Sequence, residues 1–251
     1  MEERWNGSVV LEAGRLRFRG RLGTTHAHAH AAVQLVIVRS GTVELADRYG
    51  GRLAVSAAVI PSRATHSLHA EEAQGTVLYY DSDSRFGRAL RARFPTAPGD
   101  RVTDWVSAAG GAAWSPGAPA GGRTAAAPHP AVGRAVDRVR SRLHGPVSLE
   151  EVATALHLSP SRLGHLFAEE LGLPFPAYVR WARIRRAIEL VRAGATLTQA
   201  ACGAGFYDSS HLTRVVHEMF GMAPSQLLRD VRWEPSPQRI RPSGPGRAGA
   251  P

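Results

Sequence analysis

The sequence predicts an α+β chain, with a β-barrel of the jelly-roll type in its N-terminal part and an all-α region in its C-terminal part. Short apolar runs broken by turn residues fill the stretch up to about Tyr80, which is typical of sandwiches and barrels. From Val132 to about Val231 the apolar residues instead recur at helical spacing. A stretch rich in Gly, Ala and Pro separates the two patterns. The 251 residues therefore accommodate two domains.

The β domain is predicted from five short runs, and one helix follows them. Phe86, Leu90 and Phe94 lie four residues apart with arginines between them, which indicates a helix over residues 84–94. Beside a barrel, such a helix is suited to pairing two copies of the chain. The predicted strands are residues 33–38, 41–45, 53–55, 58–60 and 76–80.

The composition changes divide the chain into four predicted segments. The last one is rich in Pro, Gly, Ser and Arg and too poor in apolar residues to bury a core. The segments are a β domain at 1–107, a linker at 108–129, a helical domain at 130–232 and a disordered tail at 233–251.

Charge and hydropathy favour a cytoplasmic protein with a nucleic-acid partner. Hydrophobic residues make up 43% of the chain and charged residues 21%, and no apolar run approaches the roughly 20 residues of a membrane span. We therefore expect no membrane partner. The net charge of +10 attracts nucleic acid without regard to base sequence, so it supports a DNA partner without establishing one.

The helical domain opens with two helix-start signals. Ser148 and Glu151 form a capping box, whose hydroxyl and carboxylate satisfy free amides at a helix start. Ser159 followed by Pro160 marks a second start, because serine caps helices and proline fits the first turn. Two short helices joined by a tight turn are what a helix-turn-helix needs to place its second helix in the DNA major groove. A single match of this kind also suits any helical hairpin.

The same pattern recurs further along the chain. Thr196 and Gln199 make another capping box, and Asp208 caps the helix that follows. Between the two units, residues 176–192 predict one amphipathic helix of roughly 25 Å. This length could set two recognition helices near the roughly 34 Å of one DNA turn, so that one chain reads two successive major-groove segments.

The second unit carries a recognisable signature. Residues 205–214 read Gly-Phe-Tyr-Asp-Ser-Ser-His-Leu-Thr-Arg, and residues 220–225 read Phe-Gly-Met-Ala-Pro-Ser. This sequence resembles the signature of AraC/XylS-type transcriptional regulators, and the resemblance extends over about residues 130–229. It implies a sequence-specific DNA-binding regulator of operator DNA, controlled by an effector, which forms a homodimer and, as an activator, contacts RNA polymerase.

The resemblance also implies base-reading positions in both units. Gly164 departs from the family pattern, since it offers no side chain where a long polar one is common, and Val216 stands where phenylalanine is usual. The first unit is therefore expected to read bases less strongly than the second. The positions are Ser161, Arg162, Gly164 and His165 in the first unit, and Ser209, Ser210, Thr213 and Arg214 in the second.

Three histidines alternate in the β domain. If this stretch is a strand, His26, His28 and His30 point to one face. Imidazoles gathered on one face are suited to a transition metal such as zinc, copper, nickel or iron.

His28 and His30 are followed by Gln34 and Gly41, and then by Pro61 and His66. This arrangement resembles the two motifs of the cupin family, which bind a divalent metal inside a barrel. The resemblance implies His28, His30, Gln34 and His66 as the ligands of a divalent transition metal. Gln34 stands in place of the family's acidic ligand, and Arg63 in place of a turn glycine. The histidines could equally line a small-ligand pocket or cap the barrel mouth.

Two functional classes compete for the β domain. A sensor binds a small-molecule or metal effector and changes how the DNA-binding part is arranged. A metalloenzyme would instead use open metal positions for catalysis. The sensor is favoured over the enzyme, because the domain is joined to a DNA reader and the sequence shows no nucleophile-base pair.

Overall fold

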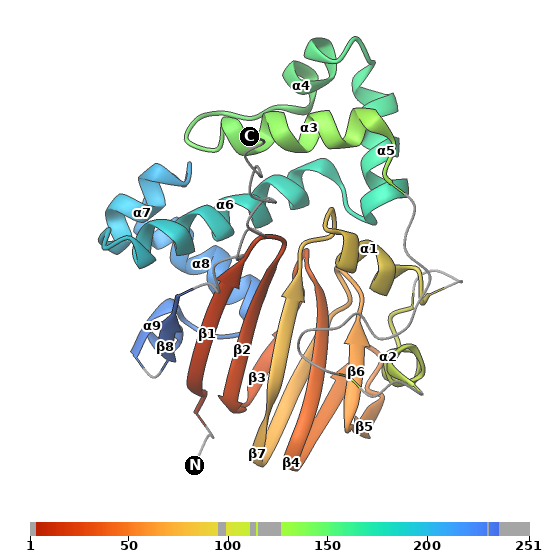
Figure 1. Ribbon diagram of the computed structural model, residues 1–251, viewed down its shortest axis with the longest axis vertical. Helices are drawn as coiled ribbons and strands as arrows, with labels where there is room; N and C mark the ends of the chain where they lie inside the picture. The colour runs from red at the N-terminus through yellow and green to blue at the C-terminus, as the bar shows by residue number, and fades with distance from the viewer. Residues whose placement is uncertain (1–3, 95–98, 111–113, 115–126, 230, 236–251) are drawn as a thin grey trace, which may run out of the picture.

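The structure, a computed structural model, describes residues 4–94, 99–110, 114, 127–229 and 231–235. Its N-terminal half is a large mixed β-sheet and its C-terminal half is helical, with the helices above and beside one end of the sheet (Figure 1). The predicted α+β class is therefore confirmed. Most of the predicted linker and the tail from residue 236 lie outside the described residues.

The described strands form one sheet in the hydrogen-bonded order β5-β4-β7-β2-β1-β8, with β3 beside β7 and β6 beside β4. Neighbouring strands are antiparallel except β1 and β8, which are parallel. The strands are β1 Asn6–Glu12, β2 Arg15–Arg21, β3 Thr25–His28, β4 Val33–Asp47, β5 Arg52–Ala54, β6 Ala57–Ile60, β7 His66–Tyr80 and β8 Val231–Glu234.

β4 and β7 are the long strands of the sheet and pair with each other along their whole length. β4 unites the predicted strands 33–38 and 41–45, because register shifts between them let the strand continue where the sequence suggested a turn. Gly41 lies at this bend with a φ of 74°, and its Cα approaches the backbone of Glu72 too closely for any side chain. The two ends of β4 can therefore pair with different neighbours, β6 and β5.

Helices make up the rest of the described chain. The predicted helix over 84–94 is α1, in which the Ser84 hydroxyl accepts a hydrogen bond from the Gly87 amide. The sequence did not reveal α2, because its alanine-rich end merges with the Gly, Ala and Pro run. None of the described helices is long and apolar enough to cross a membrane. They are α1 Arg85–Arg91, α2 Val102–Ala109, α3 Pro130–Ser141, α4 Leu149–Ala155, α5 Pro160–Leu171, α6 Phe175–Arg192, α7 Leu197–Gly203, α8 Ser209–Phe220 and α9 Pro224–Arg229.

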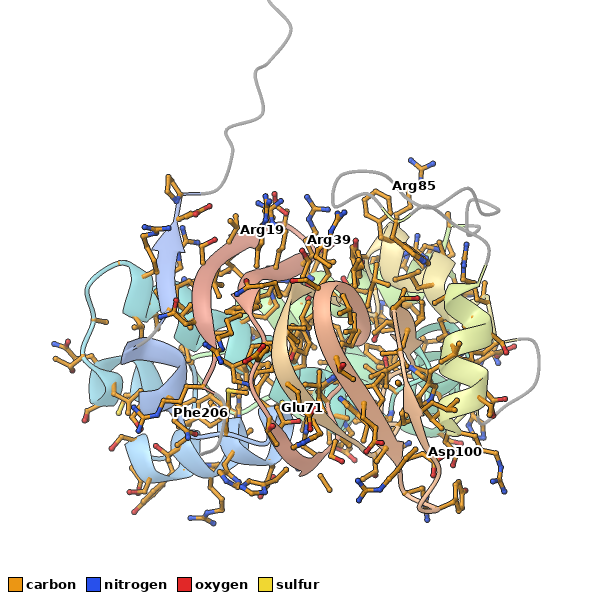
Figure 2. The ribbon with its side chains drawn as sticks, turned by 90° about the horizontal axis from the view of Figure 1, so that it is seen from below. Arg19, Arg39, Glu71, Arg85, Asp100 and Phe206 are labelled. Atoms are coloured by element: carbon orange, nitrogen blue, oxygen red, sulfur yellow. The ribbon has the colours of Figure 1, made fainter. Side chains whose placement is uncertain are left out.

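The sheet has helices on both faces, and β2 shows how the faces are separated. Leu16 and Phe18 are buried toward α6 and α8, whereas Arg17 and Arg19 lie on the opposite face. Figure 2 shows Arg19, together with Arg39, on the side of the sheet away from α8.

α1 and α2 cover the apolar part of that opposite face. Phe86 and Leu90 of α1 pack with Tyr80, and the rings of Tyr80 and Phe86 lie 5.9 Å apart. The apolar side of α1 is thus buried within its own chain. Pairing of two copies through this helix stays a prediction.

β8 brings the end of the helical half back to the sheet. It pairs in parallel with β1, where Gly7 lies opposite Val231 and Val10 opposite Glu234. The predicted disordered tail, which began at residue 233, was therefore wrong for Trp233 and Glu234. Their backbone completes a sheet edge, and Trp233 packs against the core, so long-range pairing overrides a weak local signal.

Ion pairs and hydrogen bonds hold α6 against the sheet. The buried carboxylate of Asp81, at the end of β7, accepts hydrogen bonds from Trp181 Nε1 at 2.9 Å and from Arg185 at 2.7 Å. Nearby, Arg140 of α3 pairs with Asp83 at 3.0 Å. The helical half is thus docked on the sheet through partners that lie far apart in the sequence.

Candidate functional site

α4 and α5 form the first predicted helix-turn-helix, called here the first unit. Both helices begin at the predicted caps: Ser148 Oγ accepts from the Glu151 amide at 3.1 Å, and Ser159 Oγ accepts from the Arg162 amide at 3.2 Å. In the tight turn between them, His157 has a φ of 56°. The turn is short because this residue adopts the left-handed conformation.

α7 and α8 form the second unit. Thr196 and Gln199 complete the predicted capping box reciprocally, at 3.2 and 2.9 Å. Asp208 accepts from the His211 amide at 2.6 Å and so begins α8. Gly221, with a φ of 65°, ends α8, and its amide donates to the His217 carbonyl at 2.9 Å.

The predicted base-reading residues lie on the outer sides of α5 and α8, the second helix of each unit. Among the described residues, no hydrogen bond or ion pair engages the guanidinium groups of Arg162 and Arg214, so their donors face solvent. Gly164, Ser209 and Thr213 are half-buried. The exposed members are Ser161, Arg162, His165, Ser210 and Arg214.

α6 joins the two units as one helix of 18 residues, about 27 Å long. Trp181 and Ile184 are buried and Arg180 and Arg186 are exposed, which confirms the predicted amphipathic pattern. Two capped helix pairs with polar outer faces, held by one rigid helix, therefore form the candidate DNA-binding surface.

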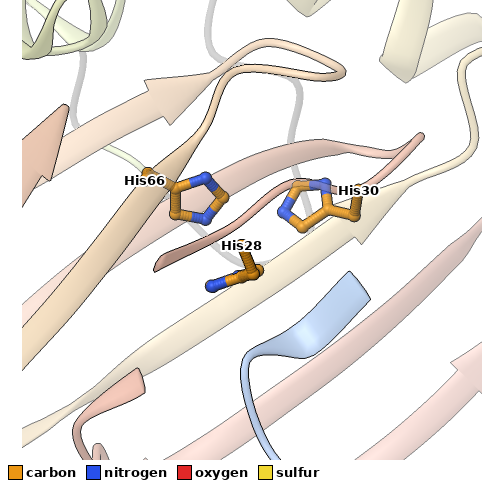
Figure 3. A group of neighbouring side chains, drawn as sticks. All are labelled: His28, His30 and His66. Carbon is orange, nitrogen blue, oxygen red and sulfur yellow. The ribbon is translucent and has the colours of Figure 1, made fainter. Parts of the chain in front are cut away.

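The second candidate site is the three-histidine cluster, formed by His28, His30 and His66 (Figure 3). One ring nitrogen of each residue lies within 4.8 Å of one ring nitrogen of the other two, and all three side chains are buried. His28 at the end of β3 lies opposite His66 at the start of β7, so strand pairing brings distant parts of the sequence together.

Hydrogen bonds orient all three imidazoles in the same way. The Nδ1 atoms of His28, His30 and His66 lie 2.8–2.9 Å from the backbone carbonyls of residues 26, 32 and 64. A carbonyl only accepts, so each Nδ1 carries the proton and each neutral ring keeps a lone pair at Nε2. Donation of Nδ1–H to a backbone carbonyl is typical of histidines that bind metals through Nε2.

Two of these lone pairs have no partner. His28 Nε2 and His66 Nε2 are buried and make no hydrogen bond with any described residue. His30 Nε2 lies 2.7 Å from Gln34 Oε1. An amide oxygen only accepts, so this contact suits either an Nε2 that carries a proton or two lone pairs that share one cation as ligands. Buried unpaired nitrogens in a group of imidazoles this close together fit a divalent transition metal.

Burial keeps the three-histidine cluster uncharged. Desolvation, aided by the neighbouring imidazoles, lowers the pKa of His28 to about 3 and that of His66 well below its usual value. The pKa of His30 is also lowered, mainly by burial. Neutral imidazole is the form that binds a metal ion, so the rings are ready to act as ligands without losing a proton.

The helical half matches known DNA-binding proteins. A family model described as a helix-turn-helix domain matches residues 152–230. The transcriptional activator RhaR of Pectobacterium atrosepticum is 32% identical over 91 residues, which cover 36% of this chain and 32% of RhaR. The transcriptional activator and DNA repair enzyme Ada of Escherichia coli is 36% identical over 82 residues, covering 33% of this chain and 23% of Ada. The matches thus span a third or less of these relatives. Residues 152–230 form an AraC-type DNA-binding domain.

Solved structures share the arrangement of this AraC-type domain behind a β domain. A ligand-free ToxT variant from Vibrio cholerae has a TM-score of 0.54 and 13% identity, over 86% of this chain and 97% of that chain. ToxT bound to an unsaturated fatty acid has a TM-score of 0.51 and 14% identity, over 89% and 96%. At these identities the likeness shows a common fold.

The structure shows the surroundings of Gly164 and Val216, the two residues that depart from the family pattern. A Cβ atom at Gly164 would meet only Leu149, at an ordinary 3.7 Å, so a side chain fits there. Val216 lines an apolar cavity of about 90 Å³ between the second unit and the sheet, together with Phe18 and Trp233. The smaller valine thus leaves space where a phenylalanine is usual.

In the β domain, the structure corrects one expectation and supports the geometry of another. His26 is exposed and does not share a face with His28 and His30, because a register shift interrupts β3 and the strand ends before His30. Arg63, in place of a turn glycine, adopts the glycine-like φ of 68°. His28, His30, Gln34 and His66, the residues of the cupin resemblance, do come together.

Gly221, a residue of the sequence signature, lies against the three-histidine cluster. A Cβ atom there would lie 2.7 Å from the His26 carbonyl oxygen and 2.8 Å from His28 Nδ1. No local sequence signal could reveal this contact, since it depends on how α8 docks on β3.

Proposed function

We propose that this chain regulates transcription by reading two successive major-groove segments of operator DNA, under the control of a divalent metal bound in its β domain. The observation that carries the first part is the pair of capped units with polar outer faces on a single helix, α6. The second part rests on the three buried imidazoles, whose ring nitrogens lie within 4.8 Å of one another, and on the unpaired Nε2 atoms of His28 and His66. The activity belongs in the cytoplasm, where the DNA is.

Each recognition helix has a set of donors for DNA. Arg214 on α8 is exposed, and a guanidinium can donate to O6 and N7 of one guanine, which discriminates against other bases by about 1–3 kcal/mol. Ser209, Ser210 and Thr213 flank it on the first turns of the helix. On α5, Arg162 and His165 lie beside Gly164, so the first unit has fewer side chains for base edges and relies more on phosphates.

The metal site belongs to the sensor part of the proposal. His28, His30 and His66 would hold the ion through Nε2, with the Gln34 amide as a weaker fourth ligand. A bound divalent ion supplies a positive charge and fixed bond lengths, which order the buried rings around it. ToxT bound to a fatty acid provides the competing idea of an organic effector in the β domain.

Homodimer formation and contact with RNA polymerase complete the proposal. Two linked copies would present four recognition helices, and binding of one copy raises the effective concentration of the other at the operator. This part rests on the AraC-type domain and the resemblance described above. Analytical ultracentrifugation at micromolar concentration tests it, and a purely monomeric protein contradicts it.

The DNA-reading part is tested by selection from a random-sequence duplex pool, followed by hydroxyl-radical footprinting. We expect an enriched sequence with two protected segments about one helical turn apart. The uniform retention of all sequences, with binding that only follows salt concentration, would contradict sequence-specific reading.

The metal part is tested on purified full-length protein with Co²⁺ and Zn²⁺. We expect one ion per chain, with Co²⁺ showing the visible absorption of a low-coordinate nitrogen site. His66→Ala should abolish this absorption, and His26→Ala, which changes an exposed histidine outside the cluster, should keep it. Equal metal binding by both variants contradicts the site. A turnover screen of the metal-loaded protein tests the alternative of a metalloenzyme, which measurable turnover would favour.

A further inference from the structure

The three-histidine cluster lies against the end of the second recognition helix. Gly221, which caps α8, faces the backbone of His26 and the ring of His28, and there is no room for a Cβ atom between them. In Figure 3, the ribbon of the C-terminal half passes beside His28. Any displacement of the His28 ring or of β3 therefore meets the cap of α8 directly.

A second contact path joins the same two places. The ring of His30 packs edge-on against Tyr79 at 5.1 Å, and Tyr79 packs edge-on against Phe220 at 5.4 Å. Phe220 is the last residue of α8 and is buried. Two of the three histidines thus each reach the C-terminal end of α8, one directly and one through a single aromatic ring.

A bound metal ion would fix the distances between the three imidazoles. Nitrogens bound tetrahedrally at about 2.1 Å from one ion lie roughly 3.4 Å apart. The ring nitrogens of the cluster are separated by up to 4.8 Å. Such an ion would therefore draw the rings together by up to about 1.4 Å. Because packed interiors do not deform freely, this closure shifts the groups that contact the rings.

α8 can carry such a shift to DNA. The helix has 12 residues, a length of about 18 Å, and its amide-capped end at Gly221 belongs to the same hydrogen-bonded rod as Arg214. In the described part of the chain, the end of α5 faces a different neighbour: its C-cap, Gly172, lies against Arg91 of α1. A change at the cluster therefore acts directly on the end of α8.

We infer that occupancy of the three-histidine cluster by a divalent transition metal sets the position of α8 through Gly221 and Phe220, and so controls base reading by the second unit selectively. This inference rests on the proposed function, because it needs both the metal site and DNA reading. Reciprocity follows: the factor by which metal changes DNA affinity equals the factor by which DNA changes metal affinity.

The test is a linkage measurement on the full-length wild-type protein. Zn²⁺ affinity is measured by competition with a chelator, with and without the selected duplex, and duplex affinity is measured with Zn²⁺ and with EDTA. We expect both factors to agree and to lie between about 5-fold and 150-fold. Amide exchange should change on Zn²⁺ addition in α8 and stay unchanged in α5.

A matched pair of glycine variants isolates the contact. Gly221→Ala places a methyl group against His26 and His28, whereas Gly194→Ala adds one in open space at a residue that also has a positive φ, 94°. Both variants bear the strain of a left-handed alanine. We expect Gly221→Ala to reduce the linkage factor toward 1 and Gly194→Ala to keep it.

The outcomes separate the inference from the function on which it rests. If Zn²⁺ does not bind, or the duplex is not read, the proposed function fails. If both bind and the linkage factor is 1, the metal and the DNA sites stand, but the inference is wrong. The inference also fails if Zn²⁺ changes amide exchange equally in α5 and α8, or if both glycine variants reduce the linkage alike.

Discussion

The two recognition helices end against the β domain in opposite ways. Both end at a glycine with positive φ, Gly172 for α5 and Gly221 for α8. Gly172 faces the side chain of Arg91, whose guanidinium donates to the Glu169 carbonyl near the surface. Gly221 faces the buried His28 instead. The end of α5 thus faces one long polar side chain, whereas the end of α8 faces a packed interior.

This difference indicates which unit is coupled more strongly to the β domain. A solvent-accessible charged contact contributes little to stability, because water and side-chain entropy compete with it. A packed aromatic contact is costly to disturb, because the interior cannot close around a gap. We therefore expect α8 to follow the β domain closely and α5 to be coupled to it weakly. The unit with the fuller set of proposed base-reading side chains is also the one whose recognition helix ends in the packed interior.

The largest expected effect comes from breaking the packed contact. Phe220→Ala removes a ring that contacts Tyr79 and Trp181, and should lower the free energy of unfolding by about 3–5 kcal/mol. Urea unfolding measures this loss. Phe220→Leu, which keeps most of the volume, should lose less than half as much. Equal losses for the two variants would show that the aromatic contact is not what holds α8.

The unequal reading of bases gives the next effect. Arg214→Ala should weaken binding to the selected duplex by about 1–3 kcal/mol relative to random DNA, because it removes the guanidinium that we propose donates two hydrogen bonds to one base. Arg162→Ala in the first unit should weaken both duplexes more evenly and reduce the salt dependence. Fluorescence anisotropy on both duplexes measures the difference, with Arg19→Ala on the far face of the sheet as the control. A larger loss of discrimination in Arg162→Ala would reverse the ranking.

The buried histidines behind the second unit predict a dependence on pH. Burial lowers the pKa of His28 from 6.5 to about 3, so the unfolded chain binds more protons than the folded chain between these values. The stability of the metal-free protein is thus complete above pH 6.5 and decreases as the pH falls through this window, by at most about 1.4 kcal/mol per pH unit for each such histidine.

Urea unfolding in EDTA at several pH values checks this dependence. His66→Phe, which removes one buried titrating ring, should flatten the decrease on the acid side. His26→Ala, an exposed site, should leave the slope as it is in the wild type. A wild-type stability that stays constant between pH 6.5 and about pH 4 would contradict the buried neutral state.

Substitution of Gly164 in the first unit is expected to have a smaller effect on stability. Gly164→Ala should stabilise the protein by about 0.5–1 kcal/mol, because alanine loses less backbone entropy in a helix and its methyl group fits beside Leu149. Thermal unfolding measures it. Gly133→Ala in α3, where the added Cβ has nothing within 4 Å, serves as the comparison. If only the substitution at position 164 destabilised the protein, this position would require a residue without a side chain.

The smallest effect is expected at the polar contact of the first unit. Arg91→Ala removes the hydrogen bond to the Glu169 carbonyl and should change the free energy of unfolding by about 0.5–1 kcal/mol. The metal-DNA linkage should be the same as in the wild type. If Arg91→Ala instead lowered the linkage as much as Gly221→Ala, the two contacts would be equivalent and the comparison would fail.

The sequence by itself determined the local parts of this protein. Caps such as Ser159 and Asp208 act on amides three residues away, and the apolar period of α6 is set within one helix, so both could be read directly from neighbouring residues. The exposed sides of α5 and α8 followed from the same periodicity. The α+β order and the DNA-binding half were therefore predictable.

Only the tertiary structure decided how the halves meet. Three contacts join residues that are far apart in the chain. His28 lies opposite His66, β8 pairs with β1, and Asp81 accepts hydrogen bonds from Trp181 and Arg185. Such contacts depend on strand register and on the burial of one surface against another, which no local pattern encodes. For the same reason the signature glycine Gly221 was visible in the sequence, while the histidine ring that it touches was not.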